Sequence, residues 1–218
     1  MIDQLPEFII YQCQNDSCRF RFPIALTDAH PVPGLYCPKC GGMTRAVEPA
    51  YGNYKQQVAM PAPTGPAVEA LLDNIRSTYN VGAMFRTADG AGLRHLHLSG
   101  VTPTPTNAKV GKTALGAETA VPWSYHLNGL EAALQLKEKG FRLWVLESRP
   151  MAESLFAVAQ ALAGPPVLLV VGNEISGVDP GLLQACDKVL AIPMMGQKRS
   201  LNVAIAFGIT AYMLRFGI

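Results

Sequence analysis

Beyond residue 66, apolar runs of strand length alternate along the chain with stretches of helical periodicity. The apolar runs predict strands over residues 67–75, 93–99, 141–146, 167–171 and 188–192. The periodic stretches predict helices over residues 80–91, 130–139, 180–186 and 201–216. Strands that alternate with helices in this way predict an α/β fold, with a mostly parallel sheet covered by helices on both faces.

Residues 46–66 lose this periodicity and collect proline and glycine, which favours an extended and irregular backbone. We therefore predict three parts: a small metal-binding module over residues 1–48, a linker over 49–66, and the α/β domain over 67–218. A module of that size buries little core, so it needs a disulfide or a metal to hold it together.

Composition narrows the class of protein without identifying a partner. Apolar residues make up 49% and charged residues 16% of the chain, which indicates a well-packed protein and argues against disorder. A net charge of +2 neither indicates nor excludes a polyanionic partner, because a local basic patch can exist within a near-neutral total. No apolar run is long enough for a membrane span, and the first residues lack the layout of a signal peptide, so we expect a cytoplasmic protein.

Four of the five cysteines form two closely spaced pairs near the start of the chain. Cys13 and Cys18 enclose four residues, Cys37 and Cys40 enclose two, and eighteen residues separate the pairs. In a reducing compartment this spacing predicts four thiolate ligands around a structural zinc ion. Two alternatives stay open: four unrelated buried cysteines, or His30 in place of one thiolate.

The remaining cysteine and two histidines have simpler interpretations. Cys186 lies in an apolar helical stretch and is interpreted as a packed residue. His95 and His97 share one face of a predicted strand, far from any cysteine pair, so we do not expect them to bind the metal.

In the α/β domain, residues 73–92 form the first of three segments with polar residues where a strand meets a helix. They read as a strand end, a polar turn, and a helix that is capped at Asn80 and closed near Gly90 or Gly92. Arg86 lies on that helix, where an α/β sheet presents functional groups. The alternative is that Asn80 is only a helix cap and Arg86 only a surface residue.

Two further segments repeat the same plan. Residues 168–179 are an apolar strand that ends in a polar loop, in which Gly172 allows close approach of a ligand or another backbone. Glu174 in this loop has the alternative role of capping the helix that begins near residue 180. Residues 192–207 are again strand, loop and helix, with Ser200 predicted to cap the helix and Asn202 in its first turn.

Together, and in this order, the three segments resemble the signature motifs of the SpoU or TrmH branch of the SPOUT RNA ribose methyltransferases. The resemblance extends from about residue 68 to residue 216 and includes residues 112–118. It implies a C-terminal trefoil knot, S-adenosylmethionine as cofactor, tRNA or rRNA as substrate, methylation of a ribose 2′-hydroxyl, and a homodimer that pairs through the knot region and the last helix.

The resemblance also implies which residues form the site. The positions that would hold the cofactor are Gly172, Glu174, Ile192, Met194, Ser200 and Leu201. Those that would act on the substrate are Arg86, Asn80, Glu174, Ser200 and Asn202. We interpret Arg86 as a clamp on the phosphate beside the reacting ribose, because a guanidinium is normally protonated at accessible pH. Two acceptors for the hydroxyl proton stay open: the phosphate itself, or an arginine deprotonated by its surroundings.

Two other classes of protein were weighed against this interpretation. A nicotinamide-dependent dehydrogenase is excluded, because Gly90 and Gly92 end a helix instead of opening one, and His95 stands where a third glycine is needed. A non-catalytic RNA-binding protein on the same fold remains the alternative, since a fold can persist after its chemistry is lost.

Overall fold

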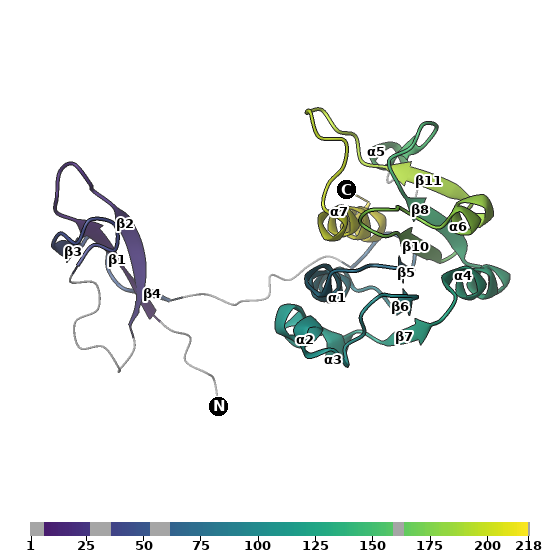
Figure 1. Ribbon diagram of the computed structural model, residues 1–218, viewed down its shortest axis with the longest axis horizontal. Coiled ribbons are helices and arrows are strands. Elements are labelled where there is room, and N and C mark those ends of the chain that lie inside the picture. Colours follow the sequence, from purple (N-terminus) through teal and green to yellow (C-terminus); the bar gives the residue numbers. More distant parts are fainter. Residues whose placement is uncertain (1–6, 27–35, 53–61, 159–163, 218) are drawn as a thin grey trace. The chain divides into compact units, whose positions relative to one another are not determined.

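The computed structural model describes residues 7–26, 36–52, 62–158 and 164–217. The chain divides into two compact units, residues 1–61 and residues 62–218, each described here by itself (Figure 1). Within the described residues, no helix combines the length and apolar character that a membrane crossing requires.

The N-terminal unit is a small antiparallel sheet. Its strands are β1 (Glu7–Cys13), β2 (Arg21–Leu26), β3 (Thr44–Ala46) and β4 (Tyr51–Gly52), and the other three all pair with β1. Phe8 of β1 pairs with Tyr51 of β4. Tyr51 and Gly52, which lie within the predicted linker over residues 49–66, thus pair with the sheet.

The second unit contains a seven-stranded sheet in which every pair of neighbours is parallel. The strand order is β7-β6-β5-β10-β8-β11-β9. The strands are β5 (Val68–Asp73), β6 (Leu96–Ser99), β7 (Trp123–His126), β8 (Arg142–Leu146), β9 (Glu153–Ser154), β10 (Val167–Val171) and β11 (Lys188–Ala191). The five predicted strands are confirmed. The two missed strands, β7 and β9, are the edge strands, which are short and carry polar residues.

Helices cover both faces of this sheet, as predicted. They are α1 (Thr78–Ala91), α2 (Ala108–Ala114), α3 (Ala117–Ala120), α4 (Gly129–Glu138), α5 (Leu155–Val158), α6 (Pro180–Ala185) and α7 (Val203–Phe216). Figure 1 shows α1 and α7 on one side of the strands and α4 and α6 on the other. The predicted α/β class is thus confirmed, and the trefoil knot stays a prediction from the family resemblance.

Alternate residues of the central strands supply the two cores. Val68 and Leu72 of β5 join a large cluster with Phe85 of α1 and Phe207 of α7. Leu71, between them in sequence, faces the other way and packs in a smaller cluster. A strand buried on both faces reads as a continuous apolar run, which is why these strands were predictable.

The caps of the two long helices differ from the prediction. The N-cap of α1 is Ser77, whose Oγ accepts a hydrogen bond from the backbone N of Asn80 at 3.3 Å. The N-cap of α7 is Asn202, not Ser200. Asn80 was the wrong choice because it already lies inside the first turn, and its side-chain amide is therefore available for other bonds. The expected C-cap of α1 at Gly92 is confirmed, with the residue in the left-handed conformation at φ 66°.

A polar cluster lies across β5, β6 and β7, away from the cysteines. His97 Nε2 donates to Glu69 Oε2 at 2.9 Å, and His97 Nδ1 lies 3.1 Å from His126 Nε2. His95 Nε2 and His126 Nε2 each lie 2.9 Å from Ser124 Oγ. Burial, followed by the nearby His97, lowers the pKa of both His95 and His126. These two rings therefore resist protonation in the folded state.

This cluster predicts a loss of stability in mild acid. A histidine with a folded pKa below its unfolded value near 6.5 contributes fully above that pH, and its contribution falls as the pH falls through the folded pKa. We expect the free energy of unfolding to decrease from pH 7 to pH 5. His126→Gln should make this decrease shallower in urea titrations at the two pH values. An unchanged pH dependence in that variant would contradict the assignment.

Candidate functional site

A cavity of about 340 Å³ lies at the carboxyl ends of β10, β8 and β11. Ligands of open α/β sheets bind at this edge, where the loops after adjacent strands meet. The strand order places β8 between β10 and β11, so three loops and the start of α7 enclose one space. Its lining residues are Leu146, Glu147, Ser148, Val171, Gly172, Asn173, Glu174, Ile175, Gly177, Ala191, Ile192, Met194, Ser200, Leu201, Asn202, Val203 and Ala206.

The structure places every residue predicted to hold the cofactor in this lining. These are Gly172, Glu174, Ile192, Met194, Ser200 and Leu201. Gly172 is required by its surroundings, because a Cβ there would lie 2.5 Å from the backbone C of Gly177. The loop folds back at this point, where Asn173 and Gly177 exchange backbone hydrogen bonds of 3.0 Å in both directions.

Glu174 joins the loop after β10 to the start of α1. Its Oε2 accepts from Arg76 N at 2.9 Å, and its Oε1 accepts from Ser77 N at 3.1 Å and from Asn80 Nδ2 at 2.8 Å. Partial burial raises the pKa of this carboxyl, but the hydrogen bonds outweigh it and leave the pKa below its usual value. The ionised form is thus favoured. The alternative role as cap of α6 is excluded, since Asp179 occupies that position.

Asn202 extends this connection to α7. Its Nδ2 donates to Asn80 Oδ1 at 3.1 Å, while its Oδ1 caps α7 by accepting from Ala204 N at 2.8 Å. Glu174, Asn80 and Asn202 therefore form one continuous chain of hydrogen bonds, which we call the Glu174–Asn80–Asn202 chain. It ties together the three segments that the sequence singled out, at the rim of the cavity.

Two other predicted residues lie outside this chain. Arg86 is exposed on α1, and its guanidinium has no hydrogen-bond or ion-pair partner among the residues described. Six helical residues turn about 240°, so Arg86 and Asn80 project from different sides of α1. Ser200 is exposed and lines the cavity, but its side chain makes no hydrogen bond within the described part of the chain.

Sequence reasoning overlooked several polar residues at the same edge of the sheet. Glu147 and Ser148 follow β8 and line the cavity. Asn173 Nδ2 donates to Asn74 O at 2.7 Å, and its Oδ1 accepts from Ile175 N at 2.9 Å, which shapes the loop. A usable signal existed, because each of these residues comes directly or almost directly after a buried apolar strand.

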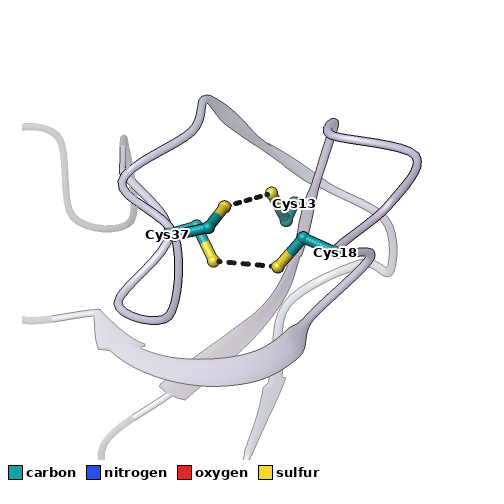
Figure 2. A group of neighbouring side chains, drawn as sticks. Cys13, Cys18 and Cys37 are labelled. Carbon is teal, nitrogen blue, oxygen red and sulfur yellow. Dashed lines mark hydrogen bonds between the residues drawn. The ribbon is translucent and has the colours of Figure 1, made fainter.

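The four cysteines of the N-terminal unit lie together, as their spacing predicted (Figure 2). Cys13 Sγ is 3.5 Å from Cys40 Sγ, Cys18 Sγ is 3.8 Å from Cys37 Sγ, and all four sulfurs lie within 4.8 Å of one another. Four thiolates around one zinc at about 2.3 Å would have sulfurs about 3.8 Å apart. The cluster therefore has the dimensions of a tetrahedral metal site, and His30 lies outside the described residues.

Backbone amides support the sulfurs. Asn15 N donates to Cys13 Sγ and Lys39 N donates to Cys37 Sγ, each at 3.4 Å. Burial raises the pKa of the Cys37 thiol. Hydrogen bonds from backbone amides and neighbouring thiols outweigh burial and lower this pKa to about 7. Cys37 is thus deprotonated most readily, whereas at Cys13 and Cys18 the backbone hydrogen bonds are outweighed by burial and the neighbouring thiols, which raise the pKa of Cys13 to about 12 and that of Cys18 above its usual value. Cys186, in the other unit, donates to Leu183 O and packs against the smaller apolar cluster.

Comparison with known proteins links this site to one family. Residues 67–212 match the SpoU rRNA Methylase family. The 23S rRNA (guanosine-2′-O-)-methyltransferase RlmB of Vibrio parahaemolyticus is 32% identical over 142 residues, which are 65% of this chain and 56% of RlmB. The tRNA (guanosine(18)-2′-O)-methyltransferase of Aquifex aeolicus is 32% identical over 144 residues, which are 64% of each protein.

A solved structure shows the same fold. The SpoU methyltransferase AviRb from Streptomyces viridochromogenes, in complex with AdoMet, matches with a TM-score of 0.62 at 21% identity. The match covers 80% of this chain and 68% of AviRb. Across RlmB proteins from several bacteria, the chain spans 56% to 59% of the relative's length.

The double role of Asn202 leads to a stability prediction. Asn202→Ala removes the cap of α7, which should lower the free energy of unfolding by about 1 kcal/mol. Asn202→Ser keeps a capping oxygen but is too short to reach Asn80, so it should be destabilised less. Urea unfolding of both variants and the wild type measures the difference. Equal destabilisation by alanine and serine would show that the side chain does not stabilise α7 as a cap.

Proposed function

The chain belongs to the SpoU rRNA methylase family, and from this premise we propose that it transfers the methyl group of S-adenosylmethionine to a ribose 2′-hydroxyl of tRNA or rRNA. The new C–O bond replaces the C–S bond, so S-adenosylhomocysteine is the leaving group and the hydroxyl proton is released. The observation that carries the proposal is the Glu174–Asn80–Asn202 chain, which brings three polar segments to the rim of one cavity. We expect the reaction to take place in the cytoplasm.

The cavity suits S-adenosylmethionine, which supplies an electrophilic methyl group on its sulfonium when bound. Ile192, Met194 and Leu201 offer an apolar wall for a flat base, while Gly172 and the turn up to Gly177 present backbone close to the ligand. No lysine, arginine or histidine lines the cavity, so its described lining favours a cationic cofactor over an anionic one. AviRb, which shares the fold, binds AdoMet in its solved structure.

Arg86 is proposed to bind the RNA phosphate beside the reacting ribose. Its exposed guanidinium is free to form the two parallel hydrogen bonds that a phosphate accepts. Held in this way, the ribose hydroxyl would be aligned with the sulfonium, and alignment is a large part of catalysis in a reaction between two bound groups. Asn80, Glu174, Ser200 and Asn202 would complete the surface on which the ribose rests.

Arg86 gives the test of the catalytic proposal. Arg86→Ala should reduce methyl transfer by about 100-fold or more while cofactor affinity changes little, because the cavity lining does not include Arg86. Arg86→Lys should restore only part of the rate, since an ammonium lacks the fork geometry. The measurements are tritiated methyl incorporation into tRNA and rRNA from cells that lack this protein, and calorimetry with S-adenosylmethionine.

Two results would overturn this division of roles. An alanine variant as active as the wild type would remove Arg86 from the reaction. A wild-type protein that binds RNA but methylates none would favour the non-catalytic RNA-binding alternative.

The four-cysteine cluster is proposed to hold a structural zinc ion. The sulfur separations suit tetrahedral coordination, and four protein ligands leave no position for substrate. Few side chains are buried among the described residues of the unit, so the free energy of metal binding would supply much of its folding free energy.

Elemental analysis of freshly purified protein tests this proposal. We expect about one zinc per chain. The double variant Cys37→Ser/Cys40→Ser should lose it, because two of the four ligands are gone. Cys186→Ser serves as the matched control and should keep the metal. A wild-type preparation without zinc, or a double variant that retains it, would contradict the assignment.

A homodimer is proposed to form through α7. Phe207 and Leu214 of this helix are buried within the unit, yet Ile205 is 56% exposed and Tyr212 38% exposed on another side. These two residues are seven positions apart and share one face. In a two-fold interface, an exposed apolar face of this kind would pack against the same face of a second copy.

Light scattering should therefore give twice the chain mass of 23.4 kDa at micromolar concentration. Ile205→Glu should shift the protein toward monomer, because it would bury a charge in the interface. Leu127→Glu, at a residue 88% exposed and outside α7, is the control and should remain dimeric. A monomeric wild type would remove the proposal.

A further inference from the structure

A second carboxylate, Glu147, lines the cavity and has no part in the Glu174–Asn80–Asn202 chain. It directly follows β8, the strand between β10 and β11, and is half-buried. Its Oε2 accepts a hydrogen bond from Val178 N at 3.1 Å. The side chain is therefore anchored by one oxygen beneath the loop that follows β10.

Gly177 fixes this arrangement further. It has a positive φ of 76°, and a Cβ there would lie 2.7 Å from Glu147 Oε2, so only glycine lets the loop rest on the carboxylate. The other oxygen, Oε1, has no hydrogen-bond partner among the described residues. An anchored carboxylate with one unpartnered oxygen at a cavity wall is an acceptor prepared for hydroxyl or amine donors.

Within the described lining of the cavity, Glu147 is the acidic residue with an oxygen free to accept a hydrogen bond from a ligand. Glu174 is the other acidic residue of the lining, and both of its oxygens already accept protein hydrogen bonds. Among the described residues of the lining, no basic side chain is present to form an ion pair with Glu147. Glu147 Oε1 is thus the ionisable acceptor of the described lining that remains for a ligand.

We propose that Glu147 binds the ribose hydroxyls of the adenosine part of the cofactor. The inference rests on the proposed function and assigns one recognition element within it. Strand order supports it: the apolar wall for adenine follows β11, and the Glu174–Asn80–Asn202 chain, where methyl transfer would take place, starts after β10. The ribose joins the adenine to the methionine part, and β8 lies between those two strands.

The chemistry of a vicinal diol matches the acceptor. Two neighbouring hydroxyls both donate, and a charged acceptor makes stronger hydrogen bonds than a neutral one. Acidic residues after strands of other nucleotide-binding α/β sheets hold ribose in the same manner. The cofactor has two other donors that could bind Glu147, the adenine amino group and the methionine ammonium. The experiment below distinguishes both from the ribose hydroxyls.

Calorimetry with three ligands tests the proposal: 5′-methylthioadenosine, its 2′,3′-dideoxy analogue, and S-adenosylhomocysteine. The variant is Glu147→Gln, whose amide oxygen can still accept from Val178 N, so the loop should keep its fold. Glu138→Gln, at an exposed residue of α4 outside the cavity, is the matched control. Thermal unfolding of both variants verifies that they are folded.

We expect Glu147→Gln to bind methylthioadenosine and S-adenosylhomocysteine about tenfold more weakly than wild type, with Glu138→Gln unchanged. The dideoxy analogue should bind wild type and Glu147→Gln equally, because it lacks the hydroxyls. A loss that persists with the dideoxy analogue, a loss seen only with S-adenosylhomocysteine, or no loss at all would overturn the inference and leave the proposed function intact. A wild type that binds none of these ligands nor S-adenosylmethionine would overturn both.

Discussion

The carboxylate of Glu174 is the interaction on which the site depends. It lies after β10 but receives three hydrogen bonds from the start of α1, nearly one hundred residues earlier in the chain. Backbone N–H groups ahead of a helix have no partner within the helix, and a charged acceptor makes stronger hydrogen bonds to them than a neutral one. One side chain thus satisfies the turn before α1 and fixes the position of its first residues.

Asn80 connects Glu174 to α7. It donates to Glu174 through one end of its amide and accepts from Asn202 through the other. Because Asn202 also caps α7, the position of that helix depends on the same chain of bonds as the loop after β10. The cavity lies between these elements, so its shape follows from a few polar contacts supported by a rigid sheet.

Sequence patterns revealed the central strands and the cysteine cluster because each has a local signature. Strands buried on both faces, such as β10, appear as unbroken apolar runs, and two cysteine pairs at ligand spacing require no knowledge of the fold. The edge strand β7 was missed because its polar residues, among them Ser124 and His126, interrupt that signature.

The sequence predicted only some of the residues of the site, because the positions of the others depend on the order of the strands in the sheet. Motif positions identified Glu174, Asn80 and Asn202, but the caps at Ser77 and Asn202 could be assigned only from backbone geometry. Glu147 directly follows a buried apolar strand, which was a usable signal, but its place in the cavity depends on β8 lying between β10 and β11, and the sequence does not show that order. Asn80 and Arg86 point in different directions because they are six residues apart on a helix. This difference could have been predicted from the sequence.

We propose that the hydrogen bonds of Glu174 hold the cavity in the shape that binds S-adenosylmethionine. Calorimetric titration of S-adenosylmethionine into wild type and Glu174→Ala measures this effect. The variant should remain folded, because the two apolar cores do not include Glu174. We expect one site per chain in the wild type and an affinity at least about tenfold lower in the variant. Equal affinity in the two proteins would contradict it.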